Sequence, residues 1–252
     1  MTLTGPAADN RTDRDGQERG RRPALLAISH GTSSLDGQRA IGDLVRAVGE
    51  TLGGVRVGNG FVDVQQPDVS SVLQRLAPHE SAVVVPLLLS AGYHVHVDLA
   101  NELAAAEGRD VSLAAALGPD DRLVQILASR VAERGLAPSD AIVLAAAGSS
   151  DHRAVRDCLE MGRRLATTLA RPVTVGFISA AVPRLSSAIE TTRRLHPKSR
   201  VIVSSYLLAP GFFADLAASA GGDVTTEPLL VAGRRAPQQL IDLVRERYLD
   251  AI

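Results

Sequence analysis

Tryptophan is absent from the 252-residue chain, and cysteine occurs once, at Cys158. A single cysteine can form neither an internal disulfide nor a cysteine-based metal site, so the sequence predicts a reducing, cytoplasmic compartment. Neither sign of charge is in excess, with 27 basic against 28 acidic residues. This balance argues against a nucleic-acid partner, because nucleic-acid binding usually needs a basic excess or a basic stripe.

Long apolar runs are also missing. No segment reaches the ~18 apolar residues that a membrane-spanning helix requires, so we expect no membrane partner. Residues 1–22 are polar, contain no apolar stretch of the kind a signal peptide has, and lack periodicity. Such a segment buries too little apolar surface to offset the entropy of ordering, and it predicts a disordered tail.

From residue 23 onward, short apolar runs alternate with amphipathic stretches. The first part predicts strands at 24–29, 55–61, 82–89 and 111–116, and helices near 35–53, 67–78, 95–107 and 120–134. The second part predicts strands at 141–146, 173–178 and 201–206, a weaker one near Val224, and helices near 151–170, 182–196, 213–219 and 236–249. Strands that are apolar throughout are typical of parallel sheets covered on both faces. The predicted fold class is α/β, with doubly wound parallel sheets.

Three landmarks of the first part recur in the second, displaced by 116 to 119 residues. Segment 29–34 corresponds to 146–150, segment 60–63 to 176–179, and segment 87–92 to 206–211. Repetition of this kind indicates an internal duplication. We therefore predict two similar domains, at 23–137 and 138–252, and a monomer, since one chain then supplies both halves of a cleft.

Ligands of open parallel sheets bind beyond the carboxyl ends of the strands. His30 follows the first predicted strand, Asp63 follows the second, and His94 follows the third. Two imidazoles and a carboxylate at one sheet edge suit a divalent metal such as iron, cobalt, nickel or zinc. The second half has Ala147 and Phe213 at the positions of the two histidines, so we expect one metal site per chain.

His96 and Asp98 are further candidates near His94. In a helix, His94 and Asp98 would share a face, and the carboxylate could orient the imidazole. In an extended segment, His94 and His96 would share a side, which makes His96 an alternative ligand. The other histidines, His79, His152 and His196, are expected to be solvated, and Cys158 is expected to be a buried, inert thiol.

Two serine-containing loops precede predicted helices. Ser33 and Ser34 lie in the first loop, and Ser149 and Ser150 lie in the second. Free backbone N–H groups and the helix dipole favour an anion at such positions, while ordinary helix capping is the competing interpretation. Neither a P-loop nor a dinucleotide-binding glycine motif is present.

Taken together, these segments resemble the sirohydrochlorin chelatases, the class II chelatases that insert Co²⁺ or Fe²⁺ into a reduced tetrapyrrole. The resemblance rests on Ser29-His30-Gly31-Thr32, on Gly60-Phe61-Val62-Asp63 with Pro67, and on segment 85–94 with Asp98. It covers nearly the whole chain from Ala24, in the long two-domain form of the family.

The resemblance implies that His30 and His94 bind the metal and act in catalysis, and that Asp63 occupies a position usually held by Glu. It implies sirohydrochlorin and a divalent metal as substrates, with no permanently bound cofactor. The serines of the two loops, helped by arginines such as Arg184, would then meet substrate carboxylates.

Other functions remain open at this point. A metal or tetrapyrrole carrier would use the same residues without catalysing insertion. A histidine phosphatase would need an arginine directly before His30, where Ser29 stands. A flavodoxin-like FMN module would need aromatic residues to stack the flavin, and only 3% of the residues are aromatic.

Overall fold

A computed structural model describes residues 22–90, 99–103 and 109–252. Two four-stranded parallel sheets form the framework, with strand orders β2-β1-β3-β4 and β6-β5-β7-β8. The strands are β1 (Ala24–Ser29), β2 (Val57–Phe61), β3 (Ala82–Pro86), β4 (Val111–Leu113), β5 (Ala141–Ala146), β6 (Val173–Phe177), β7 (Val201–Tyr206) and β8 (Val224–Thr225). The helices are α2 (Leu35–Thr51), α3 (Val69–Gln74), α5 (Asp121–Glu133), α6 (His152–Leu169), α7 (Leu185–Leu195), α8 (Phe212–Ala218) and α9 (Gln238–Leu249).

The predicted α/β class and parallel sheets are confirmed, and the differences lie at element ends. Helix α3 is shorter than the predicted helix at 67–78. It begins after Asp68, whose side chain caps it by accepting a hydrogen bond from the N–H of Ser71. It ends at Gln74, with Arg75 as its C-cap, before Pro78 is reached. Most of the predicted helix at 95–107 lies outside the described residues.

The turns after β2 and β6 repeat one another closely. In the first half, the N–H of Phe61 donates to the carbonyl of Pro67 at 3.0 Å, and in the second, that of Phe177 donates to Pro183 at 2.9 Å. Gly31 and Gly148 hold matching positive φ angles of 95° and 92°. A side chain on either glycine would overlap the backbone of Asp63 or Ser179, respectively. The two halves therefore share a backbone plan as well as a sequence pattern.

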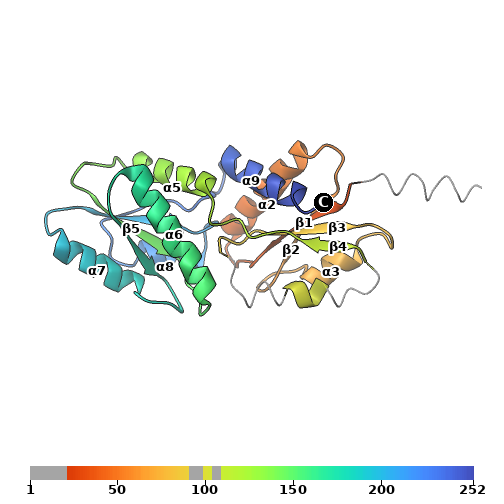
Figure 1. Cartoon of the computed structure of the whole chain (residues 1–252), viewed down its shortest axis with the longest axis horizontal. Coiled ribbons are helices and arrows are strands. Elements are labelled where there is room, and N and C mark those ends of the chain that lie inside the picture. The colour runs from red at the N-terminus through yellow and green to blue at the C-terminus, as the bar shows by residue number, and fades with distance from the viewer. Residues whose placement is uncertain (1–21, 91–98, 104–108) are drawn as a thin grey trace, which may run out of the picture.

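The last helix of each half packs against the other half. Helix α5 packs against α6 and β7, whereas α9 packs against α2 and β3. Figure 1 shows the blue α9 beside α2, and α5 beside α6. The hydroxyl of Tyr248, at the end of α9, donates to the carbonyl of Pro23 at 2.6 Å. The domain division at 137/138 stays a prediction, and the helix exchange adds a connection that the sequence pattern did not indicate.

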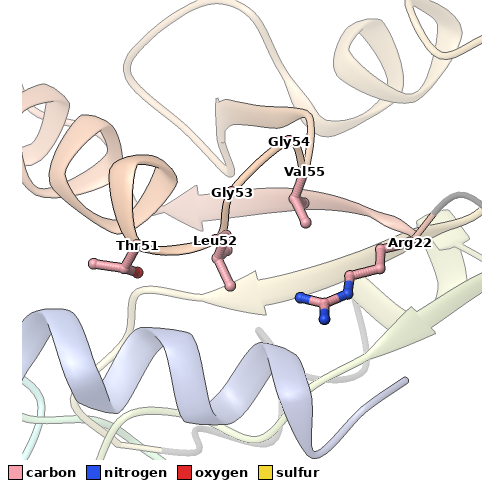
Figure 2. Close-up of a pocket in the computed structure, with 6 residues that line it drawn as sticks. All are labelled: Arg22, Thr51, Leu52, Gly53, Gly54 and Val55. Carbon is pink, nitrogen blue, oxygen red and sulfur yellow. The ribbon is translucent and has the colours of Figure 1, made fainter.

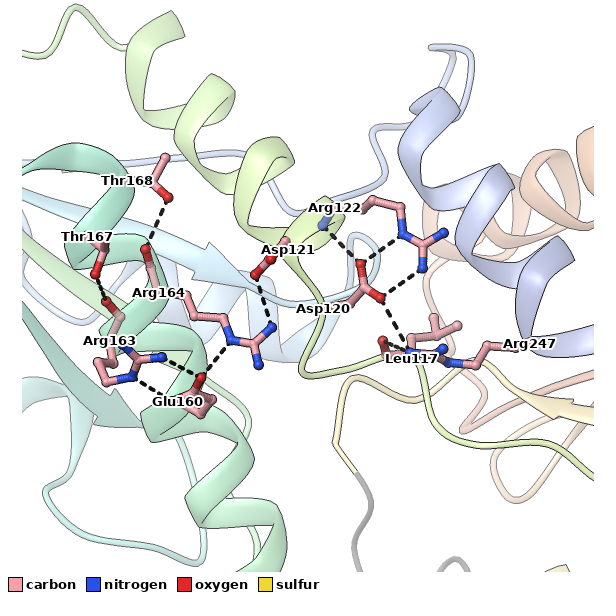
Figure 3. A network of polar contacts seen from close by, with 10 residues as sticks. All are labelled: Leu117, Asp120, Asp121, Arg122, Glu160, Arg163, Arg164, Thr167, Thr168 and Arg247. Carbon is pink, nitrogen blue, oxygen red and sulfur yellow. Dashed lines mark hydrogen bonds and ion pairs between the residues drawn. The ribbon is translucent and has the colours of Figure 1, made fainter. Parts of the chain in front are cut away.

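A polar network lies where the two exchanged helices, α5 and α9, meet. Figure 3 shows its members Asp120, Arg122 and Arg247. Arg122 donates to the carboxylate of Asp120 at 2.8 and 2.9 Å, and to Glu246 of α9 at 2.9 Å. Arg247 of α9 donates to the carbonyl of Ala116 at 2.9 Å. These contacts fix α9 both to the first turn of α5 and to the segment that precedes it.

Apolar packing is continuous between the halves. One core cluster includes Leu25 of the first sheet, Leu144 of the second sheet and Leu243 of α9. The other face of the first sheet packs on α3 through Val72, and the other face of the second packs on α7 through Ile189. Both faces of each sheet are covered, which is why β3 and β5 are apolar throughout. Within the described ranges, no helix is both long and apolar enough to cross a bilayer.

Two glycines of α2 provide a matched test of this packing. A methyl group at Gly37 would overlap the carbonyl oxygen of Pro210 and lie 2.8 Å from a methyl carbon of Thr32, whereas one at Gly42 would meet nothing within 4 Å. Gly42→Ala is therefore expected to stabilise the protein by about 0.5–1 kcal/mol through helix propensity. Gly37→Ala is expected to destabilise it by about 1–3 kcal/mol through overpacking. Urea unfolding measures both values, and equal stabilisation by both substitutions would contradict the close contact between the halves.

Candidate functional site

A cleft of about 490 Å³ opens between the two halves, at the carboxyl ends of the central strands. Its lining includes residues that follow β1 and β3 in the first half and β5 and β7 in the second. Most of the lining side chains are apolar, for example Ile41, Leu88 and Leu208. Its position agrees with the rule that parallel sheets bind ligands beyond their carboxyl edge.

His30 is the first residue after β1, and its exposed side chain lies on the wall of the cleft. Its carbonyl accepts a hydrogen bond from the N–H of Asp63 at 3.1 Å. The turn at Gly31 permits this close approach, because a side chain there would overlap Asp63. Among the described residues, the lining contains no Asp, Glu, Lys or Arg. The imidazole of His30 is thus the one exposed ionisable side chain in the described part of the lining.

Asp63 is exposed, and it is not among the residues that line the cleft. Its Oδ1 accepts a hydrogen bond from the N–H of Val64 at 2.7 Å. One carboxylate oxygen thus stabilises the local turn, which leaves the other available for a ligand. The structure places the backbone of Asp63 beside that of His30, and a metal-binding role for its side chain stays a prediction.

His94, His96 and Asp98 lie outside the described residues. Within the ranges that the structure does describe, no three His, Cys, Asp or Glu side chains cluster closely enough to hold a metal ion. The predicted meeting of His30 with His94, and the parts given to His96 and Asp98, therefore stay predictions.

The four predicted serines divide into two pairs. Ser33 and Ser149 line the cleft, whereas Ser34 and Ser150 do not. The hydroxyl of Ser34 caps α2 by accepting from the N–H of Gly37 at 3.3 Å, so the capping interpretation holds for this residue. Ser149 lines the cleft while its hydroxyl oxygen accepts from the N–H of Asp151 at 3.0 Å.

Arg184 lies away from the lining. Its guanidinium donates to the carbonyl of Ile178 at 3.4 Å, and its side chain is exposed. The cleft therefore offers hydroxyl groups, and no arginine among the described residues, to a bound carboxylate.

Ser29 was not predicted as a site residue. It lines the cleft, is only 2% exposed, and its hydroxyl has no hydrogen-bond partner among the described residues. Buried hydroxyl groups are usually paired, because an unpaired one loses its hydrogen bonds with water. The corresponding residue of the second half is Ala146. This difference between the two halves is the sequence feature that could have identified Ser29 as a site residue.

Cys158 and Tyr206 are buried in the part of the lining contributed by the second half. Burial raises the pKa of the Cys158 thiol to about 12, and the negative charge of Asp157 adds to this, while a hydrogen bond with Ser90 opposes it. Burial also raises the pKa of Tyr206 well above its usual value. The hydroxyl of Tyr206 donates to the carbonyl of Leu89 at 2.7 Å, and so joins the two halves below the cleft.

The thiol of Cys158 is expected to be unreactive in the folded protein. Its pKa of about 12 compares with a usual value of 9.0, so the thiolate fraction at pH 8 is lowered about a thousandfold. We expect an aromatic disulfide reagent at pH 8 to modify the folded protein at least about a hundredfold more slowly than the urea-unfolded chain. Equal rates would show that the thiol is not buried as described.

The remaining histidines behave as expected. His79, His152 and His196 are all exposed.

A second hollow of about 460 Å³ lies at the opposite end of the first sheet. Figure 2 shows Arg22, which precedes β1, near the end of α2 and the turn at Gly53 and Gly54. This hollow lies at the amino end of the strands and is lined by neither His30 nor any of the predicted serines.

Comparisons with known proteins agree with this architecture. The sequence profile of the CbiX family matches residues 24–134 and 141–217. A sirohydrochlorin cobaltochelatase of Sulfurisphaera tokodaii is 34% identical over 76 residues, which are 29% of this chain and 63% of that protein. One from Sulfolobus acidocaldarius is 28% identical over 115 residues, 44% of this chain and 91% of that protein. The chain thus spans less than two thirds of the length of the first of these relatives.

Solved structures share the fold over most of the chain. The sirohydrochlorin chelatase SirB from Bacillus subtilis subspecies spizizenii, in complex with cobalt, matches with a TM-score of 0.69 and 17% identity, over 91% of this chain and 94% of that one. CbiX, described as the terminal enzyme for biosynthesis of siroheme in denitrifying bacteria, matches with a TM-score of 0.65 and 18% identity, over 91% and 99%.

The two parallel α/β halves of this chain share their fold with these chelatase structures. The profile match covers both halves of the chain, from Ala24 to Ala217. The chain belongs to the CbiX family.

Proposed function

We propose that this protein inserts a divalent metal ion, Co²⁺ or Fe²⁺, into sirohydrochlorin within the cleft between its halves. The observation that carries the proposal is the exposed imidazole of His30 on the wall of a cleft whose described lining contains no Asp, Glu, Lys or Arg, in a chain of the CbiX family. The names of the curated relatives and the cobalt complex of SirB support the choice of substrates.

His30 suits the chemistry of metal insertion. Two pyrrole N–H protons must leave the tetrapyrrole as the metal enters, and a neutral imidazole near pH 7 can accept a proton or bind a divalent ion. An insertase must also release its ion, which favours few protein ligands over a closed site of four. By resemblance, His94 is the second metal-binding residue. Asp63 is a further ligand in this proposal, Asp98 orients His94, and His96 is the alternative ligand.

The cleft suits the macrocycle as well. Its apolar walls fit the faces of a flat ring, and displacement of water from apolar surface favours binding. The hydroxyls of Ser33 and Ser149 are placed to donate to carboxylates of the substrate, whereas the N–H groups of Thr32, Ser34 and Asp151 already donate to side-chain oxygens. Because both walls belong to one chain, we propose that the monomer is the active form.

Turnover distinguishes this function from a carrier. Under anaerobic conditions, sirohydrochlorin and Co²⁺ are mixed with protein at a small fraction of their concentration, and absorbance is followed after subtraction of the spontaneous rate. We expect many equivalents of product for each protein molecule. A spectral change that stops at one equivalent would instead identify a tetrapyrrole or metal carrier.

A phosphatase is the alternative enzyme class, and it is tested in parallel. Hydrolysis of a phosphomonoester with no acceleration of metal insertion would replace the proposal.

A further inference from the structure

Two large apolar side chains are exposed inside the cleft. Phe212 is 70% exposed and Val64 is 58% exposed, and both belong to the lining. Phe212 comes from the second half and Val64 from the first, so the two halves each contribute one. Large apolar groups that face water in a cleft are a sign of ligand contact, since exposure gives them no role in the core.

Val64 adopts a backbone conformation that is costly for its residue type. Its φ angle is 62°, in the left-handed region that β-branched residues rarely enter. Ala180 takes the corresponding position of the second half, with a φ of 53°. Because alanine suffices for the turn there, the larger side chain of Val64 is not required by the turn itself.

Phe212 begins α8 directly after the close contact between the halves. The preceding Gly211 has a φ of 151°, and a side chain there would lie 2.9 Å from the hydroxyl oxygen of Thr32. The ring of Phe212 lies 6.0 Å from that of Phe213, at an interplanar angle of 34°. This contact leaves most of the Phe212 ring exposed, in a chain with only four phenylalanines.

Both walls of the cleft mix polar and apolar groups, and they differ at the position of His30. The wall of the first half carries the imidazole of His30, whereas the second half has Ala147 at the corresponding position and carries the ring of Phe212. A metal ion favours the imidazole, whereas a conjugated ring favours exposed aromatic and aliphatic side chains such as Phe212 and Val64.

We propose that Phe212 and Val64 contact the macrocycle of the bound tetrapyrrole and set the affinity with which it is held beside His30. This inference rests on the proposed function, because it takes sirohydrochlorin as the occupant of the cleft. The aromatic ring of Phe212 packs against the conjugated ring system, and the methyl groups of Val64 cover a further part of its apolar surface.

The absence of tryptophan makes a direct test possible. Phe212→Trp gives the protein a single indole in the cleft, and Leu195→Trp gives one at the end of α7, outside the lining. Leu195 is a matched control because it is 71% exposed. Metal-free sirohydrochlorin is titrated into each variant, and the indole fluorescence is recorded. We expect saturable quenching of the Phe212→Trp protein and much weaker quenching of the Leu195→Trp protein.

Alanine variants measure the contribution of each contact. Phe212→Ala is expected to weaken sirohydrochlorin binding about tenfold, and Val64→Ala about fivefold, because each loses apolar area that the ligand covers. Leu195→Ala is expected to leave binding unchanged. Phe212→Ala and Leu195→Ala should unfold near the wild-type urea midpoint, since the side chains are exposed. Val64→Ala should unfold at or slightly above it, because alanine is less strained than valine at a positive φ.

The outcomes separate this inference from the proposed function. Binding that depends on Phe212, in a protein that does not accelerate insertion, would support the inference and overturn the insertase. Insertion by the wild-type protein, with unchanged binding by Phe212→Ala and Val64→Ala, would overturn the inference alone. Equal quenching of the two tryptophan variants would also overturn it.

Discussion

His30→Ala is expected to lower the enzyme-dependent rate of metal insertion by about 10²- to 10⁴-fold, the range for loss of a positioned proton acceptor. The imidazole is the exposed ionisable group of the described cleft lining, and Gly31 fixes its position beside Asp63. The free energy of unfolding should change by no more than about 0.5 kcal/mol, because the side chain is exposed. The anaerobic absorbance assay and urea unfolding provide the two values.

His79→Ala is the matched control for this experiment. His79 is also exposed, but it lies outside the lining. Its removal should leave the insertion rate unchanged. If His30→Ala retained the wild-type rate in a folded protein, the imidazole would have no part in insertion.

Asp120→Ala is expected to destabilise the protein by about 2–3 kcal/mol, less than the full cost of breaking a buried ion pair because the site is partly solvated. The carboxylate of Asp120 is 15% exposed, accepts two hydrogen bonds from the side chain of Arg122, and lies 3.5 Å from Arg247. It also caps α5 through the N–H of Arg122. Its removal leaves Arg122 and Arg247 with Glu246 as their remaining shared partner among the described residues.

Asp36→Ala is the control for the ion-pair effect. Asp36 and Arg39 form an exposed pair at 3.8 Å, and such pairs contribute about 0–1 kcal/mol. Urea unfolding of both variants gives the comparison. Equal losses of stability would mean that the network at Asp120 does not hold the exchanged helix in place.

The network around Asp120 should also make the free energy of unfolding depend on pH. Burial raises the pKa of Asp120, but hydrogen bonds and charge from Arg122, with the charge of Arg247, outweigh this and hold the pKa below the usual 3.8. A carboxyl group with a lowered pKa in the folded state stabilises the protein above its unfolded pKa, and this stabilisation is lost as pH falls through the folded value. Below pH 3.8, the wild-type protein should therefore lose stability more steeply with falling pH than Asp120→Ala. Parallel slopes in urea titrations at several pH values would contradict this assignment.

The central strands were predictable because burial on both faces requires apolar residues at successive positions, a pattern that is visible in the sequence. The run Val83, Val84 and Val85 is apolar at every position, and all three residues are fully buried. The duplication was predictable for a related reason, because Gly31 and Gly148 keep a turn that any side chain would block. In both cases, the physical requirement, either burial or a turn without a side chain, restricts which residue types can stand at the position.

The helix exchange could not be predicted in the same way. Amphipathic patterns in α5 and α9 show that one face is buried, but they do not show which sheet covers it. The choice of host depends on contacts between distant residues, such as Arg122 with Glu246 and Tyr248 with Pro23.

Side-chain direction limited the prediction of the site. Asp63 lies at the predicted sheet edge, yet one of its carboxylate oxygens accepts a hydrogen bond from the next residue. Ser34 caps a helix, while its neighbour Ser33 lines the cleft. Local hydrogen bonds decide these orientations, and sequence position alone does not distinguish between the two serines.

The location of bound metal shows directly whether the cleft is the metal site. Crystals of the protein soaked with Co²⁺ are measured at the cobalt absorption edge, and an anomalous difference map gives the position of the ion. We expect a cobalt peak inside the cleft, next to the imidazole of His30. Cobalt bound elsewhere, for example at His79 or His196, with none in the cleft, would contradict this expectation.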